Sequence, residues 1–370
     1  MIKRFMFSAT TVLVGLFEFH GASAAVYTAD CGANGSSSIV QNQLDTIASS
    51  ANNLLQVTGT CVGDVDITRA DRLTVSGLTL TGNLSMDSSV LVSIPGLKLT
   101  GQLDLVNTRR TTLTNAVVNG EADVSGSSQV RFQGLTMAPW TDGSGTHDPQ
   151  IICAGQSECT LGSLSLTGSG TALGSGNAGL YAVSASRLTL TGGLITGFDI
   201  GVQVWNNATA FLMPNCATLT IQSNLSTGVF VADGGIVKIE GQSVADSASS
   251  GCSGPFDVSI AGNGRYGVLA DGGGNAYLNL TAIQRHSIDG IRVQHGSTVR
   301  VRSSYIDAAT VSGRSARVMS QAHLYFDEQS NGPTASSILA GPVCVTGNSN
   351  VDTGNSSTVV LTPMDACNTP

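Results

Sequence analysis

The sequence has few charged residues. Asp, Glu, Lys and Arg make up 11% of its 370 residues, against roughly 25% in ordinary globular domains. Hydrophobic residues reach only 41%, and 45 glycines together with many Ser, Thr and Asn residues replace the missing charge. Such a chain is too apolar to be disordered and too poor in Leu, Glu and Lys to be mainly helical. It suits many short strands joined by tight turns.

No apolar stretch is long enough to span a membrane, which takes about 20 residues. The longest, residues 5–17, follows Lys3 and Arg4 and precedes the small residues Ala22-Ser23-Ala24. This order is typical of a signal peptide. We therefore predict a signal peptide over residues 1–24, and a mature protein that is secreted or held in the periplasm or cell envelope without a transmembrane segment.

Positive charge is also scarce. The chain has 17 Lys and Arg against 25 Asp and Glu, a net charge of −8. Without Lys3, Arg4 and Glu18, 15 basic and 24 acidic residues remain, a net charge of −9. A general affinity for nucleic acid or for an anionic membrane is therefore not expected.

All eight cysteines follow the predicted cleavage site. An even number of cysteines in an exported chain indicates disulfides. Because no Cys-x-x-Cys motif occurs and no histidine sits at ligand spacing, no metal site is predicted. The order of the cysteines favours sequential pairs: Cys31–Cys61, Cys153–Cys159, Cys216–Cys252 and Cys344–Cys367.

Residues 63–138 repeat with a period of 19. Each unit begins with a glycine at a bend and continues with apolar residues that alternate with polar ones. Period-two alternation places one face of a strand in the core. Equal spacing then predicts that equivalent residues of successive coils stack inside a solenoid. One such column is Val65, Leu84, Leu103 and Ala122.

A second family of longer units covers residues 179–312. The units are separated by 22, 27, 39 and 23 residues, and the longest spacing contains an insertion at 242–257. Variable coil lengths argue against a left-handed hexapeptide helix, whose coils are strictly regular, and favour a right-handed coil. The units are Gly179-Leu-Tyr-Ala, Gly201-Val-Gln-Val, Gly228-Val-Phe-Val, Gly267-Val-Leu-Ala and Gly290-Ile-Arg-Val.

The ends of a solenoid expose strand edges and need covers. Ser38-Ile-Val-Gln41 has the form of a capping box, and apolar residues at helical spacing follow it. We predict a short helix over residues 38–51 that caps the core, and a C-terminal cover over residues 313–370. The predicted fold is thus all-β: a right-handed parallel β-helix, or solenoid, with a short N-terminal α-helical cap, forming one domain over residues 25–370.

The run Leu54–Ile67, which follows the predicted helix, resembles the opening of secreted right-handed parallel β-helix proteins of the pectin-lyase-like class. The later Gly-Ile-x-Val units resemble the same class, so the likeness covers most of the mature chain. It implies the β-helix fold. Because the class contains lyases, hydrolases, esterases, tailspikes and adhesins, it does not select an activity.

The enzyme motifs of that class are absent. The chain has no Asp-Asp, Gly-His-Gly or Arg-x-Lys, as in polygalacturonases, and no Trp-x-Asp-His, as in pectate lyases. Asp233 and Asp271 follow similar strands one coil apart and could approach the spacing of two hydrolytic carboxylates. Each precedes Gly-Gly, however, and turn formation explains an Asp there. No catalytic residue is predicted, and whether the protein is an enzyme stays open.

Arginine is concentrated near the end of the repeats. Alternation predicts that Arg292, Arg300 and Arg302 point outward, and Tyr266 and His295 are close to them in sequence. Arginine forks bind carboxylate, sulfate or phosphate groups, so these five residues form a candidate site for an anionic glycan. The alternative is a solvated face on which Arg replaces scarce Lys. Seven of the fourteen arginines lie here: Arg265, Arg285, Arg292, Arg300, Arg302, Arg314 and Arg317.

A second outward column takes the position two residues after each repeat glycine. Its apolar members could stack on sugar rings or bind a partner strand. The alternative is that a loop or the C-terminal segment folds over them. The column is Tyr181, Gln203, Phe230, Leu269 and Arg292.

Three functions remain open. We favour a secreted β-helix that binds a glycan, with anionic glycans among the candidates, or serves a structural role at the cell surface. A lyase or glycoside hydrolase acting on an acidic polysaccharide is the alternative. In lyases of the resembling class an Arg or Lys often abstracts the proton, commonly beside bound calcium; otherwise no cofactor is predicted. A protein-binding adhesin ranks third, and the oligomeric state is not predicted.

Overall fold

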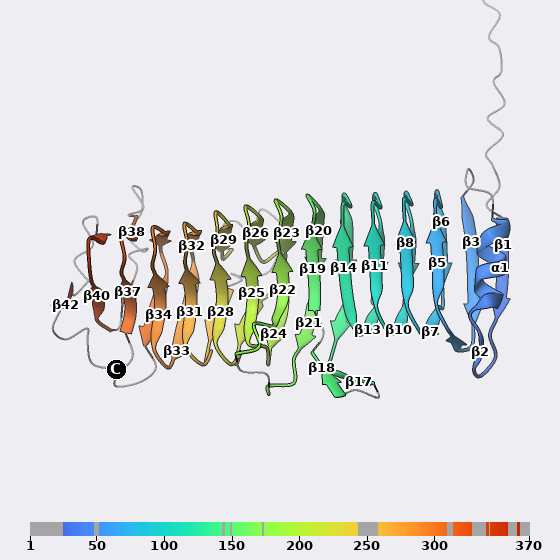
Figure 1. Cartoon of the computed structure of the whole chain (residues 1–370), viewed down its shortest axis with the longest axis horizontal. Helices are drawn as coiled ribbons and strands as arrows, with labels where there is room; N and C mark the ends of the chain where they lie inside the picture. Colours follow the sequence, from blue (N-terminus) through green and yellow to red (C-terminus); the bar gives the residue numbers. More distant parts are fainter. Residues whose placement is uncertain are drawn as a thin grey trace, which may run out of the picture.

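The computed structural model describes residues 25–47, 52–142, 145–148, 150–171, 174–242, 258–308, 314–327, 338–339, 341–353 and 361–362. The predicted signal peptide, residues 1–24, lies outside them. Within this part of the chain the regular structure is β, apart from a single helix. The strands form three parallel sheets, called here A, B and C, and the chain passes from C to A to B in each coil. Stacked coils give the elongated shape of Figure 1.

Sheet A has 14 described strands, each hydrogen-bonded to the equivalent strand of the next coil. They are β1 (Ala25–Asp30), β3 (Asn53–Thr58), β6 (Leu73–Ser76), β9 (Ser93–Pro95), β12 (Thr112–Thr114), β15 (Val130–Gln133), β20 (Glu158–Gly162), β23 (Arg187–Leu190), β26 (Thr209–Leu212), β29 (Ile236–Glu240), β32 (Asn275–Asn279), β35 (Thr298–Arg302), β38 (His323–Phe326) and β41 (Asn350–Asp352).

Sheet B has 13 described strands. They are β2 (Gly35–Ser36), β4 (Cys61–Val62), β7 (Thr79–Thr81), β10 (Lys98–Thr100), β13 (Val117–Asn119), β16 (Thr136–Met137), β21 (Leu164–Thr167), β24 (Gly193–Thr196), β27 (Leu219–Gln222), β30 (Val258–Ala261), β33 (Thr281–His286), β36 (Tyr305–Ala308) and β39 (Ile338–Leu339).

Sheet C also has 13 described strands. They are β5 (Val65–Thr68), β8 (Leu84–Asp87), β11 (Leu103–Val106), β14 (Glu121–Ser125), β19 (Gln150–Ala154), β22 (Ala178–Ala182), β25 (Ile200–Val204), β28 (Thr227–Val231), β31 (Tyr266–Ala270), β34 (Asp289–Val293), β37 (Arg314–Val318), β40 (Val343–Val345) and β42 (Leu361–Thr362).

The core is a set of stacked apolar columns. Leu84 pairs with Val65 on one side and with Leu103 on the other, and Leu103 pairs with Ala122. All four side chains are fully buried, as the alternation in sequence predicts. The parallel sheets and this register confirm the predicted parallel β-helix.

The longer units continue the same sheets. Val202 pairs with Val229, which pairs with Val268, and all three are fully buried. Strands β37 and β38 pair with β34 and β35, and β40 and β41 follow them. Part of the segment that we expected to be a cover therefore continues the coil beyond residue 312.

The one described helix, α1 (Ser38–Thr46), lies at the N-terminal end beside β1 (Figure 1). It is shorter than predicted, because the backbone is already extended at Ile47, and residues 48–51 lie outside the described part. The predicted capping box is wrong. The N-cap is Ser37, whose side chain makes no capping hydrogen bond, and Gln41 instead donates to Asp45 and to the backbone carbonyl of Asp66.

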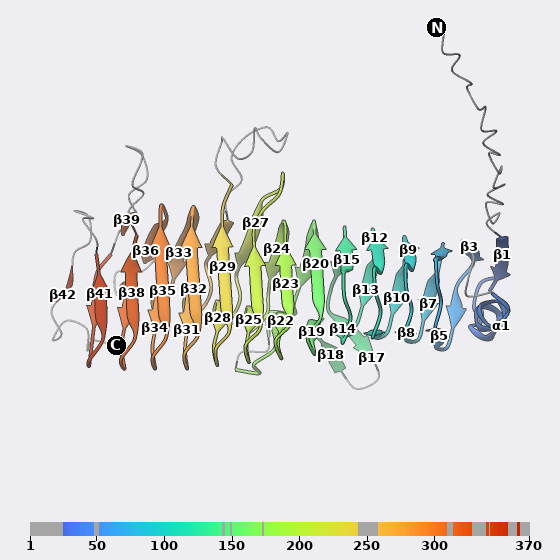
Figure 2. The ribbon, with the colours of Figure 1, turned by 90° about the horizontal axis from the view of Figure 1, so that it is seen from above.

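An antiparallel hairpin interrupts the coil after β16. Its strands, β17 (Trp140–Asp142) and β18 (Gly145–His147), pair with each other and project from the side of the solenoid (Figures 1 and 2). The coil then resumes, since β19 pairs with β14 and β20 with β15. The interval between the two repeat families therefore contains an insertion, and the coils stack on both sides of it.

Two of the predicted disulfides, Cys31–Cys61 and Cys153–Cys159, are present. Cys216 and Cys344 are also disulfide-bonded, but their predicted partners, Cys252 and Cys367, lie outside the described residues.

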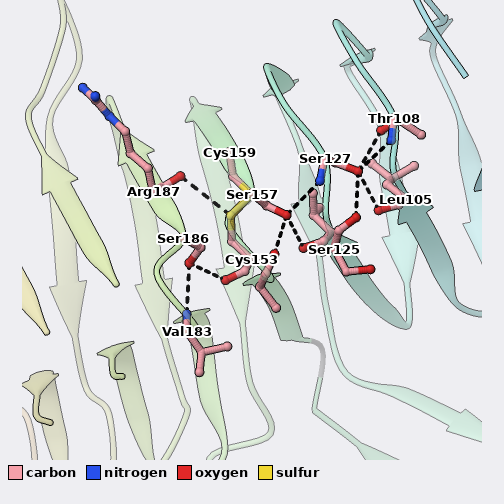
Figure 3. Close-up of a disulfide and its surroundings, with 12 residues drawn as sticks. Leu105, Thr108, Ser125, Ser127, Cys153, Ser157, Cys159, Val183, Ser186 and Arg187 are labelled. Atoms are coloured by element: carbon pink, nitrogen blue, oxygen red, sulfur yellow. Dashed lines mark hydrogen bonds between the residues drawn. A yellow bond between two sulfur atoms is a disulfide. The ribbon is translucent and has the colours of Figure 1, made fainter. Parts of the chain in front are cut away.

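Buried serines lie beside the second disulfide, at the turn from sheet C to sheet A (Figure 3). The Ser157 hydroxyl donates to the Val124 carbonyl at 3.1 Å and accepts from the Ser127 backbone N–H at 3.1 Å. Ser186 donates to the Cys153 carbonyl at 2.7 Å in the next coil. The small hydroxyl side chains thus satisfy backbone groups that the turn removes from the sheets.

Candidate functional site

The structure divides the five predicted site residues between two faces of the solenoid. Tyr266 and Arg292 lie on sheet C, in β31 and β34, whereas Arg300 and Arg302 lie on β35 of sheet A. His295 is in the turn between β34 and β35. The coil bends at this turn, so residues eight positions apart in sequence belong to different sheets. The prediction that all five form one site is not supported by their positions.

Arg300 lies between two tyrosines on the outer face of sheet A. Tyr277, Arg300 and Tyr325 are partners in the register of β32, β35 and β38. The Arg300 guanidinium carbon is 5.8 Å from the centre of the Tyr277 ring and 5.5 Å from that of Tyr325. Both distances are within the range of a cation–π interaction. The contacts hold the guanidinium between two rings while the side chain stays exposed.

This arrangement belongs to a longer column in which aromatic and basic side chains alternate from coil to coil. Figure 2 shows β29, β32, β35 and β38, which carry most of it, side by side. Arg187 adds a further cation–π contact, 4.6 Å from the Phe211 ring centre. We call this set the sheet A column: Phe211, Lys238, Tyr277, Arg300 and Tyr325.

A shallow groove of about 200 Å³ runs beside the sheet A column. Lys238 forms an ion pair with Glu240 at 2.7 Å. Among the described residues that line the groove, Arg300 and Arg302 are therefore the main cations available to a ligand. The Nε atom of Arg302 is buried without a hydrogen-bond partner. The groove is lined by Lys238, Ile239, Glu240, Tyr277, Leu278, Asn279, Arg300, Arg302 and Asp327. It therefore combines the exposed Tyr277 ring with guanidinium donors.

On sheet C, Arg292 is half-buried and held by several contacts. Its Nη1 donates to the Tyr266 hydroxyl, and its Nε donates to Gln294 at 2.9 Å. The guanidinium also lies over the Tyr266 ring, 5.0 Å from its centre. Two of the predicted residues, Tyr266 and Arg292, are therefore in direct contact.

His295 contacts a carboxylate and not the arginines of sheet A or sheet C. Its Nδ1 is 2.6 Å from Asp271, which also accepts from Gln294 and from the backbone of Gly272. Burial raises the pKa of Asp271, but the hydrogen bonds from His295, Gln294 and Gly272 outweigh it, and the pKa is lowered overall. Asp233 accepts from the Trp205 indole. Asp233 and Asp271, which we considered as a pair of hydrolytic carboxylates, are thus both engaged by neighbouring side chains.

The apolar outward column on sheet C presents little surface. Gln203 is buried and the other four members, Tyr181, Phe230, Leu269 and Arg292, are half-buried. By contrast, Tyr277 of the sheet A column is 41% exposed. Tyr277 is therefore the most accessible ring of the two columns.

Sequence reasoning identified Arg300 and Arg302 but missed Tyr277 and Tyr325. The available signal was the second strand of each longer unit, where every other residue points outward. Among the described residues, no group of three or more His, Cys, Asp and Glu side chains could hold a metal ion. In the same part of the chain, no helix is long and apolar enough to cross a membrane.

No protein-family model and no curated protein matches the chain. Two solved structures share its general architecture. The A-module of mannuronan C-5 epimerase AlgE4 from Azotobacter vinelandii is 12% identical, with a TM-score of 0.47, and the match covers 91% of this chain and 100% of that one. An alginate lyase from Paenibacillus sp. str. FPU-7 is 9% identical, with a TM-score of 0.40, covering 88% and 99%. Likeness at this level carries no conclusion about activity.

Proposed function

We propose that this protein is an exported β-helix that binds an anionic polysaccharide along the outer face of sheet A. The observation that carries the proposal is the position of Arg300 between the Tyr277 and Tyr325 rings. Exposed rings stack on the apolar faces of sugars, and guanidinium groups bind carboxylate or sulfate groups. Alternating the two along one face suits a polymer in which every unit presents both features.

The spacing of the strands supports a polymeric ligand. Neighbouring strands are about 4.8 Å apart, which is close to the length of one pyranose residue in an extended chain. A polysaccharide lying parallel to the solenoid axis could therefore place successive residues over Tyr277, Arg300 and Tyr325. Several weak contacts then act together, and binding strengthens without a deep pocket.

Export and the organisation of the chain belong to the same proposal. We infer that residues 1–24 are a signal peptide, which sends the protein to the periplasm, cell envelope or medium. Residues 25–370 then form a single domain. Helix α1 acts as its N-terminal cap, because Val40 is fully buried and Leu44 and Ile47 pack against the core.

The test is binding of polygalacturonate and other polyuronates, measured by affinity electrophoresis at low salt. Arg300→Ser combined with Arg302→Ser should weaken retention at least tenfold. The matched control is Arg131→Ser, which removes an exposed arginine from β15 on the same sheet. Its partners in register, Thr112 and Thr160, carry no rings. Equal retention of the wild type and the double variant would refute the proposal.

The same samples separate binding from catalysis. A lyase creates a double bond in its product, which absorbs in the ultraviolet. We expect no increase in absorbance when the protein is incubated with the polyuronates that it retains, with or without added calcium. A calcium-dependent increase that the double variant lacks would instead assign the groove to a lyase.

A further inference from the structure

A second cluster of arginines lies on sheet C, away from the sheet A column. Arg292 and Arg317 are direct partners in the register of β34 and β37. Both alternate with fully buried neighbours, Ile291 and Ala316, and so point away from the core. Like charges placed opposite each other on neighbouring strands destabilise a sheet. An arrangement of this kind calls for a compensating negative charge.

The carboxylate buried beside these arginines is already engaged inside the protein. Asp289 is fully buried and pairs with Arg314, whose Nε is 2.6 Å away. Burial raises the pKa of Asp289, although the hydrogen bond and the positive charge of Arg314 act in the opposite direction. Because Asp289 is already engaged by Arg314, it does not form an ion pair with Arg292 or Arg317, although the positive charges of both act on it.

Arg317 itself has an unsatisfied donor. Its side chain is half-buried, and its Nε is buried without a hydrogen-bond partner. Burial and the positive charge of Arg314 lower the pKa of Arg317. Leaving a charged donor both desolvated and unpaired is costly. Neighbouring Arg292 is fixed by Tyr266 and Gln294, so its guanidinium is oriented before any ligand arrives.

We propose that Arg292 and Arg317 form a binding site for a tetrahedral oxyanion, a phosphate or sulfate group. Such a group carries up to two negative charges and presents oxygen acceptors in several directions, which match two guanidinium forks. It would accept hydrogen bonds from the terminal nitrogens of the Arg292 and Arg317 guanidinium groups and offset their positive charge. The site is separate from the sheet A groove and does not depend on the function proposed for that groove.

The probes are inorganic phosphate, sulfate and acetate, each titrated against the full-length mature protein at constant ionic strength set with sodium chloride. We expect phosphate or sulfate to raise the melting temperature above the value in chloride alone. The stronger of the two identifies the preferred group. No rise with either anion, or an equal rise with acetate, would overturn the proposal.

Variants locate the effect. Arg317→Gln should weaken the response to the anion at least tenfold, and Arg292→Gln serves the same purpose if the first variant does not fold. Arg265→Gln removes an exposed arginine outside the cluster and should keep the full response. A full response in both Arg317→Gln and Arg292→Gln would refute the site.

A further readout separates ligand binding from a purely structural role. Without phosphate or sulfate, Arg317→Gln should melt at the same temperature as the wild type or higher, because it removes the repulsion from Arg292. A large decrease in melting temperature would show that Arg317 stabilises the fold by itself, and would contradict the inference. The double variant in the sheet A groove, Arg300→Ser with Arg302→Ser, should still respond to the anion.

Discussion

His286 should make the protein sensitive to mild acid. Its side chain is fully buried at the turn from sheet B to sheet C, and its Nε2 lies 3.1 Å from the Ile260 carbonyl. Burial lowers the pKa of His286 to about 4, although backbone hydrogen bonds to Ile260 and Asn263 act in the opposite direction. The buried ring is therefore neutral at the pH where an exposed histidine becomes charged.

The sign of the effect follows from proton binding. Between pH 6.5 and about 4 the unfolded chain binds a proton at His286 that the folded chain does not. The free energy of unfolding therefore falls as the pH falls through this window. At 1.36 kcal/mol for each pKa unit, the full loss is about 3 kcal/mol. Below pH 4 both states bind the proton, and this contribution no longer changes.

His286→Asn removes the titrating ring and places a side chain that the neighbouring coils already use at the equivalent turn. There, Asn224 donates to the Asn263 side chain at 2.9 Å, and Asn263 donates to the Ile221 carbonyl at 3.3 Å. Urea unfolding at pH 7 and at pH 4.5 should show that the wild type loses about 2–3 kcal/mol more than this variant.

The control is His295→Asn, which changes a histidine whose side chain is 59% exposed. It should keep most of the pH dependence of the wild type. If the wild type and His286→Asn lose the same free energy of unfolding between pH 7 and pH 4.5, the assignment of acid sensitivity to this buried ring is wrong.

Two further predictions concern the disulfides and the buried serines. Replacing Cys31–Cys61 by serines should cost about 3.6 kcal/mol of unfolding free energy, and replacing Cys153–Cys159 about 2.2 kcal/mol. The losses differ because the closed loops span 30 and 6 residues. Equal losses in urea unfolding would contradict the loop-length argument. Ser157→Ala should cost about 1–3 kcal/mol, since it leaves buried backbone groups of two coils unpaired. Ser157→Thr, which keeps the hydroxyl, should recover part of that loss, and no recovery would argue that the site tolerates only the smaller side chain.

The regular coils could be predicted from the sequence almost residue by residue. A strict 19-residue period puts equivalent positions on neighbouring strands, so Leu84 and Leu103 had to be partners once the solenoid was assumed. Two simple periodicities, alternation within a strand and repetition between coils, determine the core together.

The candidate site was only partly predictable. Tyr277 and Arg300 are 23 residues apart, and Lys238 and Tyr277 are 39 residues apart, yet all three occupy neighbouring strands of sheet A. The same spacings of 39 and 23 residues separate the repeat glycines Gly228, Gly267 and Gly290, so this alignment follows from the sequence once the second strand of each unit is included. The bend between β34 and β35, however, separates Arg292 from Arg300, although both point outward.

The end of helix α1 shows a different limit. Apolar residues continue at helical spacing as far as Ala51, but the backbone becomes extended at Ile47. A short helix gains little from its own hydrogen bonds and depends on what it packs against. Val40 is its one fully buried residue. The packing surface at the end of the solenoid, more than the periodicity, therefore determines where the helix ends.

The outer faces of the two halves differ in a way that the fold does not require. Leu113 on β12 and Val299 on β35 are equally buried, so the core is equally well made in both halves. The outward residue next to Leu113 is Thr112, and Arg131 on the following strand has only threonines as its partners in register, whereas Arg300, next to Val299, lies between two tyrosine rings. A threonine is enough for a stable outward position on a strand. The exposed Tyr277 ring and the paired Arg292 and Arg317 add no packing to the core, and both binding proposals rest on this difference.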